Sequence, residues 1–177
     1  MAKRNIIILL VGPKGAGKTY LASRMEDEIG ISFLRVEPIW LELMKEMRPG
    51  SSDFDIEGLS RVIEGVRERL SARSSVVLES TGTAPWFSEM HNALDAMGEL
   101  ILIKVSAPNE MCLDRIRQRD ASQHIPVSDD RIEQINMLAE RVQLPWSVEI
   151  QNTSETEVVE FLEFIRARVS KCASDQF

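Results

Sequence analysis

The chain has 177 residues, 44% of them hydrophobic, and a formal net charge of -7. This length predicts one domain, or one domain with a small mobile insert, and the hydrophobic content is sufficient for a full core. The acidic balance argues against tight non-specific binding to long nucleic acids. No run approaches the ~20 apolar residues of a membrane span, and Cys112 and Cys172 lack metal-ligand spacing. We therefore expect a soluble cytoplasmic protein.

Short apolar runs alternate with longer helical patterns along the chain. The first run, 6–11, is continuous and ends at Gly12, which is typical of a central strand buried on both faces. Between Ile56 and Leu70, apolar residues recur at spacings of three and four, as in an amphipathic helix. In chain order, the pattern predicts strands at 6–11, 32–36, 76–79, 100–105 and 148–150, separated by helices at about 19–29, 38–47, 56–70, 86–97, 110–119, 128–142 and 154–169.

Two of these helices carry start signals. Ser128 precedes two aspartates, which suits an N-cap and an acidic first turn, and Ser154 with Glu157 forms a capping box. Strands that alternate with helices predict an α/β fold with a five-stranded parallel sheet covered by helices on both faces. Ligands bind such sheets beyond the carboxyl ends of the strands. The segments that follow strands are 12–19, Glu37, 79–83 and the residues from Ser106 onward.

A phosphate-binding loop follows the first strand. Residues 12–19 read Gly-Pro-Lys-Gly-Ala-Gly-Lys-Thr and fit the Walker A pattern GxxxxGK[ST]. Its glycines let backbone N–H groups turn toward phosphate oxygens, and the next helix presents its positive N-terminus to the same anion. Lys18 would serve the β and γ phosphates and Thr19 would bind Mg²⁺, while Lys14 either faces phosphate or is simply exposed. The expected nucleotide-binding residues are Gly12, Pro13, Lys14, Gly15, Ala16, Gly17, Lys18, Thr19 and Tyr20.

Such a loop serves kinases, GTPases and motor-type ATPases. A GTPase would carry Asn-Lys-x-Asp after a late strand, but residues 105–110 read Val-Ser-Ala-Pro-Asn-Glu. A motor-type ATPase is usually larger and keeps an aspartate after an apolar strand, where this chain offers only Glu79. A small ATP- and Mg²⁺-dependent kinase fits the length best.

Two arginines in the second half support a kinase. Arg115 and Arg119 are four residues apart and therefore share one helix face. Arginines neutralise the charge that develops on a transferring phosphoryl group. A cationic helix end that runs into a polar loop suits a closing lid, at about 115–128. The alternative is a solvated helix in which Asp114 and Asp120 balance the arginines.

With these elements the chain resembles the small P-loop kinases of the adenylate-kinase-like fold, and most closely the polynucleotide-kinase and zeta-toxin-like branch. The resemblance covers about residues 6–153, and the Walker A motif is its most specific part. It implies the strand order 2-3-1-4-5. Residues 112–120 are similar to the lid helix of that branch, which implies that Arg115 and Arg119 contact nucleotide phosphates or the adenine face.

The same resemblance implies a role for Glu37. In that branch an acid after the second strand takes the proton from the acceptor hydroxyl. The branch usually has Asp there and Arg three residues later, whereas this chain has Glu37 and Trp40. The alternative is that Glu37 and Pro38 only open a helix. Trp40 either stacks on a ligand ring or belongs to the core.

The segment after the third strand resembles the Asp-x-Thr-Asn segment of that family. Glu79 would hold the Mg²⁺ shell through water, and Ser80, Thr81 and Thr83 would bond the acceptor. The alternative is that these are turn residues that satisfy backbone groups. The glycine triplet of shikimate kinases is absent, which disfavours shikimate.

The remaining features concern the acceptor. Residues at about 38–73 would form an acceptor-binding flap within a single kinase domain of residues 1–177. Asp53 and Asp55 make its tip acidic, which suits a neutral or cationic acceptor. Neither histidine, His91 or His124, has a nucleophile near it in sequence.

We therefore predict a phosphotransferase that moves the γ-phosphate of Mg·ATP to a small hydroxyl- or phosphate-bearing acceptor, acting as a monomer or homodimer away from membranes. One alternative is a nucleotide or polynucleotide 5′-hydroxyl kinase. The other is a switch that holds ATP and hydrolyses it slowly. The expected catalytic residues are Lys18, Glu37, Arg115 and Arg119.

Overall fold

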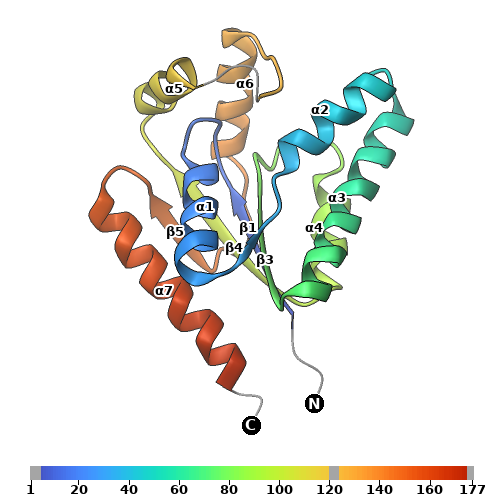
Figure 1. Ribbon diagram of the computed structural model, residues 1–177. Coiled ribbons are helices and arrows are strands. Elements are labelled where there is room, and N and C mark those ends of the chain that lie inside the picture. The colour runs from blue at the N-terminus through green and yellow to red at the C-terminus, as the bar shows by residue number, and fades with distance from the viewer. Residues whose placement is uncertain (1–4, 120–123, 175–177) are drawn as a thin grey trace.

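The protein was analysed as a computed structural model that describes residues 5–119 and 124–174 (Figure 1). The strands are β1 (Ile6–Val11), β2 (Ser32–Phe33), β3 (Ser75–Ser80), β4 (Glu99–Ser106) and β5 (Val148–Gln151). The helices are α1 (Lys18–Ile29), α2 (Val36–Glu46), α3 (Ser52–Ala72), α4 (Phe87–Asp95), α5 (Asn109–Gln118), α6 (Asp129–Glu140) and α7 (Glu155–Ser174).

The strands form one parallel sheet in the order β2-β3-β1-β4-β5, as predicted. Every residue of the central strand β1 is buried. Its side chains alternate between two cores: Ile6, Ile8 and Leu10 face one, and Ile7, Leu9 and Val11 face the other. The uninterrupted apolar run in the sequence follows from this burial on both faces.

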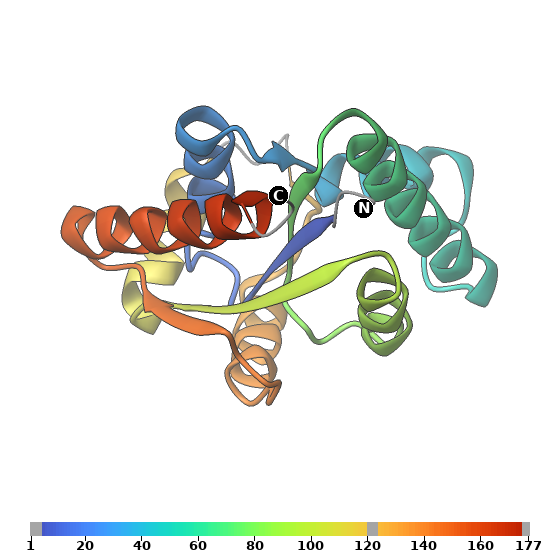
Figure 2. The same cartoon turned by 90° about the horizontal axis from the view of Figure 1, so that it is seen from below.

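Helices cover both faces of the sheet. On one face, α1 and α7 pack over the core that holds Ile8, and on the other, α2, α3 and α4 pack over the core that holds Leu9. Viewed from below, α1 and α7 lie on one side of β1 and β4, and α4 lies on the other (Figure 2). None of the helices within the described residues is long and apolar enough to cross a bilayer.

The second strand is shorter than predicted, and this moves Glu37. The strand was expected over 32–36, but β2 ends at Phe33 and α2 already begins at Val36. Pro38 therefore lies in the first turn of α2, where a proline is tolerated because the first N–H groups of a helix have no intrahelical partner. Glu37 consequently sits inside the first turn, at the carboxyl edge of the sheet.

The predicted start of the last helix is confirmed. The Glu157 N–H donates to Ser154 Oγ over 3.3 Å, and the Ser154 N–H donates to Glu157 Oε2 over 3.0 Å, which is a reciprocal capping box. Ser128 is the N-cap of α6, but its side chain makes no capping hydrogen bond.

Candidate active site

A curled backbone between β1 and α1 forms the first part of the site. Gly15 and Gly17 have φ values of +82° and +89°, which residues with a Cβ rarely adopt. There is also no room for a side chain at either glycine. A Cβ on Gly15 would lie 2.2 Å from the Cys112 carbonyl oxygen, and one on Gly17 would lie 2.1 Å from Asn152 Nδ2. The loop can thus keep its curl only with glycine at both positions.

Lys18 lies inside this curl. Its Nζ donates to the carbonyl oxygens of Gly12 and Pro13, at 2.7 and 2.6 Å. Burial lowers the pKa of Lys18 to about 8, and the negative charge of Glu79 partly opposes this shift. The loop therefore holds one enclosed cation whose charge is poorly solvated, and a bound phosphate would stabilise that charge.

Thr19 and Glu79 bring two oxygen donors together at the same loop. Thr19 Oγ1 donates to the Glu79 carboxylate, with its two oxygens at 2.9 and 3.0 Å. Within the described residues, no group of three or more His, Cys, Asp or Glu side chains could hold a metal by itself. Mg²⁺ prefers oxygen ligands and usually takes one or two from protein, the others coming from water and phosphate. The pair therefore fits a Mg²⁺ ion that arrives with a nucleotide.

The two predicted arginines line the same cavity, and Arg115 contacts the loop. Arg115 donates to the carbonyl oxygens of Gly15 and Ala16, both at 3.4 Å, and to that of Asn152 at 2.9 Å. The prediction that Arg119 shares a helix face with Arg115 was wrong, because α5 ends at Gln118 and Arg119 has an extended backbone; it still lines the cavity. Of the predicted lid at 115–128, residues 120–123 lie outside the described residues.

Two asparagines fasten the loop, and sequence analysis missed both roles. Asn136 on α6 is buried: its Oδ1 accepts from the Lys14 N–H at 2.7 Å, and its Nδ2 donates to the Lys14 carbonyl at 3.1 Å. Asn152, which follows β5 and is also buried, donates from Nδ2 to the Ala16 carbonyl at 2.9 Å. Both contacts join segments more than 120 residues apart, so no local pattern could have indicated them.

Glu37 faces the loop from α2 and is paired with His124. Glu37 Oε2 lies 2.6 Å from His124 Nδ1, and its Oε1 accepts from the Ile125 N–H at 3.2 Å. Lys14 Nζ is 3.9 Å from the same Oε1. Burial lowers the pKa of Lys14, and the Glu37 carboxylate partly opposes this shift. The histidine that had no visible partner in the sequence thus holds the predicted base.

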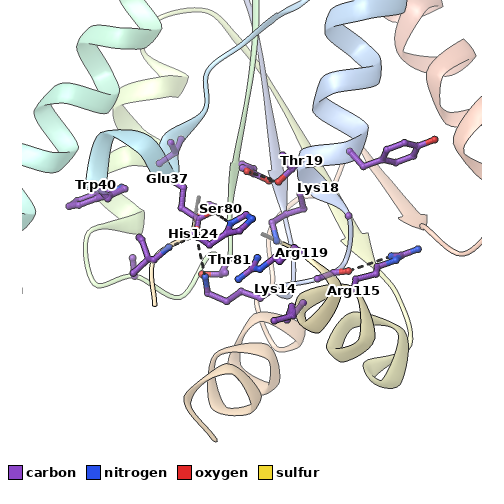
Figure 3. Close-up of a pocket in the computed structure, with 18 of the residues that line it drawn as sticks. Lys14, Lys18, Thr19, Glu37, Trp40, Ser80, Thr81, Arg115, Arg119 and His124 are labelled. Carbon is purple, nitrogen blue, oxygen red and sulfur yellow. Dashed lines mark hydrogen bonds and ion pairs between the residues drawn. The ribbon is translucent and has the colours of Figure 1, made fainter. Parts of the chain in front are cut away.

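Apart from Asn136, the side chains described above line one cavity of about 670 Å³ (Figure 3). We call one side the loop end, formed by Lys14, Gly15, Gly17, Lys18, Thr19, Tyr20, Arg115, Ile116, Arg119 and Asn152. We call the other side the tryptophan end, formed by Val36, Glu37, Trp40, Ser80, Thr81, Ala84, Trp86, His124 and Ile125. Glu79 lies between the two ends. In the close-up, Arg115 and Trp40 mark opposite sides of the cavity.

The predicted acceptor residues are divided by the structure. Ser80 and Thr81 line the cavity, whereas Thr83 is absent from its described lining and shares a 2.8 Å hydrogen bond with the Thr81 hydroxyl. Trp40 is both a core residue and a wall: it is 7% exposed and stacks on Trp86 with ring centroids 5.0 Å apart. Tyr20 lies at the rim of the loop end, where its hydroxyl bonds Glu155.

Comparison with known proteins identifies the family. Residues 7–142 match the family model AAA_33, described as an AAA domain. A shikimate kinase from Aliivibrio fischeri is 28% identical over 143 residues, 77% of each chain. A putative kinase from Chloroflexus aurantiacus superposes with a TM-score of 0.70 at 15% identity, over 93% of this chain and 98% of that one. The Pnkp1/Rnl/Hen1 RNA repair complex gives 0.62 at 15% identity, over 79% of this chain and 45% of that one. At such identities, the structural matches establish the shared fold.

Proposed function

The chain belongs to the AAA_33 family of AAA domains and is a P-loop kinase, and we propose that it transfers the γ-phosphate of Mg·ATP to a hydroxyl group of a small acceptor. The observation that supports this most is a single cavity with a cationic phosphate loop at one end and a held carboxylate, Glu37, at the other. Phosphoryl transfer depends mainly on positioning and on charge neutralisation, and this cavity offers both.

The loop end would bind ATP. Lys18 would exchange its two backbone carbonyl partners for the β and γ phosphates, since a charged oxygen is a stronger acceptor than a neutral one. Arg115 and Arg119 would neutralise the charge that spreads over the transferring group. Thr19 would hold Mg²⁺ directly and Glu79 would do so through water. When bound, this ion would neutralise the negative charge on the phosphates.

The tryptophan end would bind the acceptor and remove its proton. Glu37 would accept the hydroxyl proton as the acceptor oxygen bonds to the γ-phosphorus and the bond from that phosphorus to the β–γ bridging oxygen breaks, leaving ADP. A carboxylate has about four acceptor positions, and the contacts from His124 and Ile125 occupy only two of them. His124 would thus orient Glu37 and leave an acceptor position for the substrate.

Substitution of the base tests the proposal. We expect Glu37→Gln to lower acceptor-stimulated ADP release by about 10²- to 10⁴-fold, because the amide retains the shape but does not take up the proton. ATP affinity should stay within a factor of about two, since Glu37 lies outside the loop end. The measurements are ADP release across a broad panel of alcohols, nucleosides and nucleotides, and ATP titration by calorimetry.

The two alternative functions, an ATP-hydrolysing switch and a 5′-hydroxyl kinase, predict different results. A switch that only holds and hydrolyses ATP would respond to no acceptor and would be indifferent to Glu37→Gln. If no compound in the panel raises ATP turnover, the kinase proposal is wrong for this chain. A 5′-hydroxyl kinase would respond best to nucleotides or oligonucleotides.

A further inference from the structure

The charges of the cavity are divided unevenly between its two ends. Its lysines and arginines, Lys14, Lys18, Arg115 and Arg119, all belong to the loop end. Among the described residues, the tryptophan end has no lysine or arginine in its lining, and its only carboxylate is Glu37. A ligand group at this end would therefore meet a negative or neutral surface.

None of the described basic side chains of the neighbouring flap lines the tryptophan end. Arg61 on α3 pairs with both Glu46 and Glu57, and Lys45 on α2 pairs with Glu42. The four residues outside the described part of the lid, 120–123, read Asp-Ala-Ser-Gln, so they carry no positive charge. Lys14 is the nearest cation, and Glu37 already offsets its charge at 3.9 Å.

The wall at this end is apolar and firmly held. Trp40 stacks on Trp86 at an interplanar angle of 21°, and Phe54 supports it from α3 with ring centroids 5.5 Å apart. A Cβ on Gly58 would lie 2.0 Å from the Trp40 ring, so the helix backbone itself presses against the indole. Aromatic surface held in this way favours a ligand that covers it with apolar area.

We infer that the acceptor is an alcohol without an anionic group and with a flat apolar face, such as a ring, that lies against the exposed part of the Trp40–Trp86 wall, mainly Trp86, while its hydroxyl reaches Glu37. This inference rests on the proposed kinase function. A phosphate or carboxylate on the acceptor would lose water at a surface whose nearest cation, Lys14, is already paired with Glu37, and the Glu37 carboxylate would repel it. The tryptophan end therefore selects against anionic acceptors, including nucleoside monophosphates and hydroxy acids.

Matched pairs of alcohols test the inference. Benzyl alcohol is compared with 4-(hydroxymethyl)benzoate, and adenosine with adenosine 3′-monophosphate, because each pair differs by one anionic group and keeps a primary hydroxyl. We expect kcat/KM for phosphate transfer from ATP to be at least about tenfold higher for the neutral member, a difference of about 1.4 kcal/mol. Equal or better use of the anionic members would overturn the inference and leave the kinase proposal standing.

Binding separates the two claims if no transfer occurs. Of the three tryptophans, Trp146 lies outside the cavity lining, and its buried Nε1 has no hydrogen-bond partner within the described residues. In a Trp146→Phe protein, tryptophan fluorescence comes only from Trp40 and Trp86. If only the neutral alcohols of the two pairs quench this fluorescence, the inference is supported. The absence of phosphate transfer would then count against the kinase proposal alone. Quenching by neither neutral compound would overturn the inference.

A charge introduced at the wall sharpens the test. Ala84→Arg should raise the relative kcat/KM of the anionic members by about tenfold, because it supplies the missing cation. Ser88→Arg is the matched control, since this exposed α4 residue lies outside the cavity lining. If both variants give the same ratio, charge at this end does not set the preference and the inference fails. Should Ala84→Arg not fold, the comparison in the unaltered protein still decides.

Discussion

The two ends of the cavity are built in different ways. Most of the loop end comes from residues 14–20, which span the loop after β1 and the first turn of α1, and the glycines of this loop determine the path of the backbone. The tryptophan end is assembled from the first two turns of α2, the end of β3, the turn before α4 and residues 124–125. A phosphate needs N–H groups and positive charge at closely set points, which one short loop can supply, whereas an organic acceptor needs a shaped wall, which requires several elements.

This difference makes a general prediction about variants. Changes at the loop end should alter ATP binding and turnover together, and changes at the tryptophan end should alter turnover while ATP affinity stays constant. The four variants and conditions below test this division, beginning with the largest effect.

Removal of the enclosed charge should have the largest effect. We expect Lys18→Met to reduce acceptor-stimulated turnover by about 10³-fold, because the Lys18 ammonium lies inside the curl of the loop, where it would stabilise the transferring phosphoryl group. Lys171→Met, an exposed change on α7, is the control. Steady-state ADP release measures both. A loss of less than about tenfold would show that the loop end does not act as proposed.

A methyl group on the loop should weaken ATP binding. Gly17→Ala adds a Cβ at φ +89° and within 2.1 Å of Asn152 Nδ2, so the loop must shift, and we expect ATP affinity to fall by about tenfold or more. Gly30→Ala is a close control, because Gly30 has φ +81° with no neighbour within 4 Å. It should lose about 1–2 kcal/mol of stability and retain its affinity. Calorimetric titration and thermal unfolding distinguish the two outcomes.

Loss of the histidine partner should affect turnover alone. His124→Phe removes the group 2.6 Å from Glu37 Oε2, and we expect kcat to fall by about tenfold as the carboxylate loses its orientation. ATP affinity should not change, and Glu37→Gln and His124→Phe together should cost little more than Glu37→Gln alone. His91→Phe provides the control with the other histidine. A parallel loss of ATP affinity in His124→Phe would contradict the division between the ends.

The smallest effect is a proton taken up on ATP binding. Burial lowers the pKa of Lys18 to about 8, so at pH 9 most of the free protein carries this amine uncharged. Bound phosphates favour the charged form, so binding at pH 9 should take up most of one proton, whereas at pH 7 Lys18 is already charged and contributes no uptake. Calorimetry in buffers with different ionisation enthalpies measures this uptake, and Lys18→Met should abolish it.

The same pKa shift predicts the sign of one contribution to stability. Between about pH 8 and the ordinary lysine value of 10.5, the unfolded chain binds more protons at Lys18 than the folded one. Below about pH 8, the buried charge of Lys18 lowers the free energy of unfolding of the ligand-free protein. As pH rises through that window, this cost disappears and the free energy of unfolding increases. Lys18→Met should flatten this part of the pH dependence of unfolding.

Local signals were sufficient for most of the fold. The apolar run of β1, the helical spacing in α3 and the capping box of α7 each reflect interactions among nearby residues, and each is present as predicted. The predicted length of β2 was wrong, because the end of this strand depends on its pairing with β3 and on a helix that begins before Pro38. Both factors lie outside the short window in which strand propensity is read.

The sequence by itself determined the phosphate loop, the alternation of strands and helices, and the two arginines at the end of α5, because each is encoded in residues close together along the chain. Only the tertiary structure decided that Asn136 and Asn152 fasten the loop, that His124 holds Glu37 from 87 residues away, and that Trp40 stacks on Trp86. These contacts depend on which strand ends meet at one edge of the sheet, and the order of strands in space is not their order in the chain. The wall at the tryptophan end could therefore be described only from the folded chain.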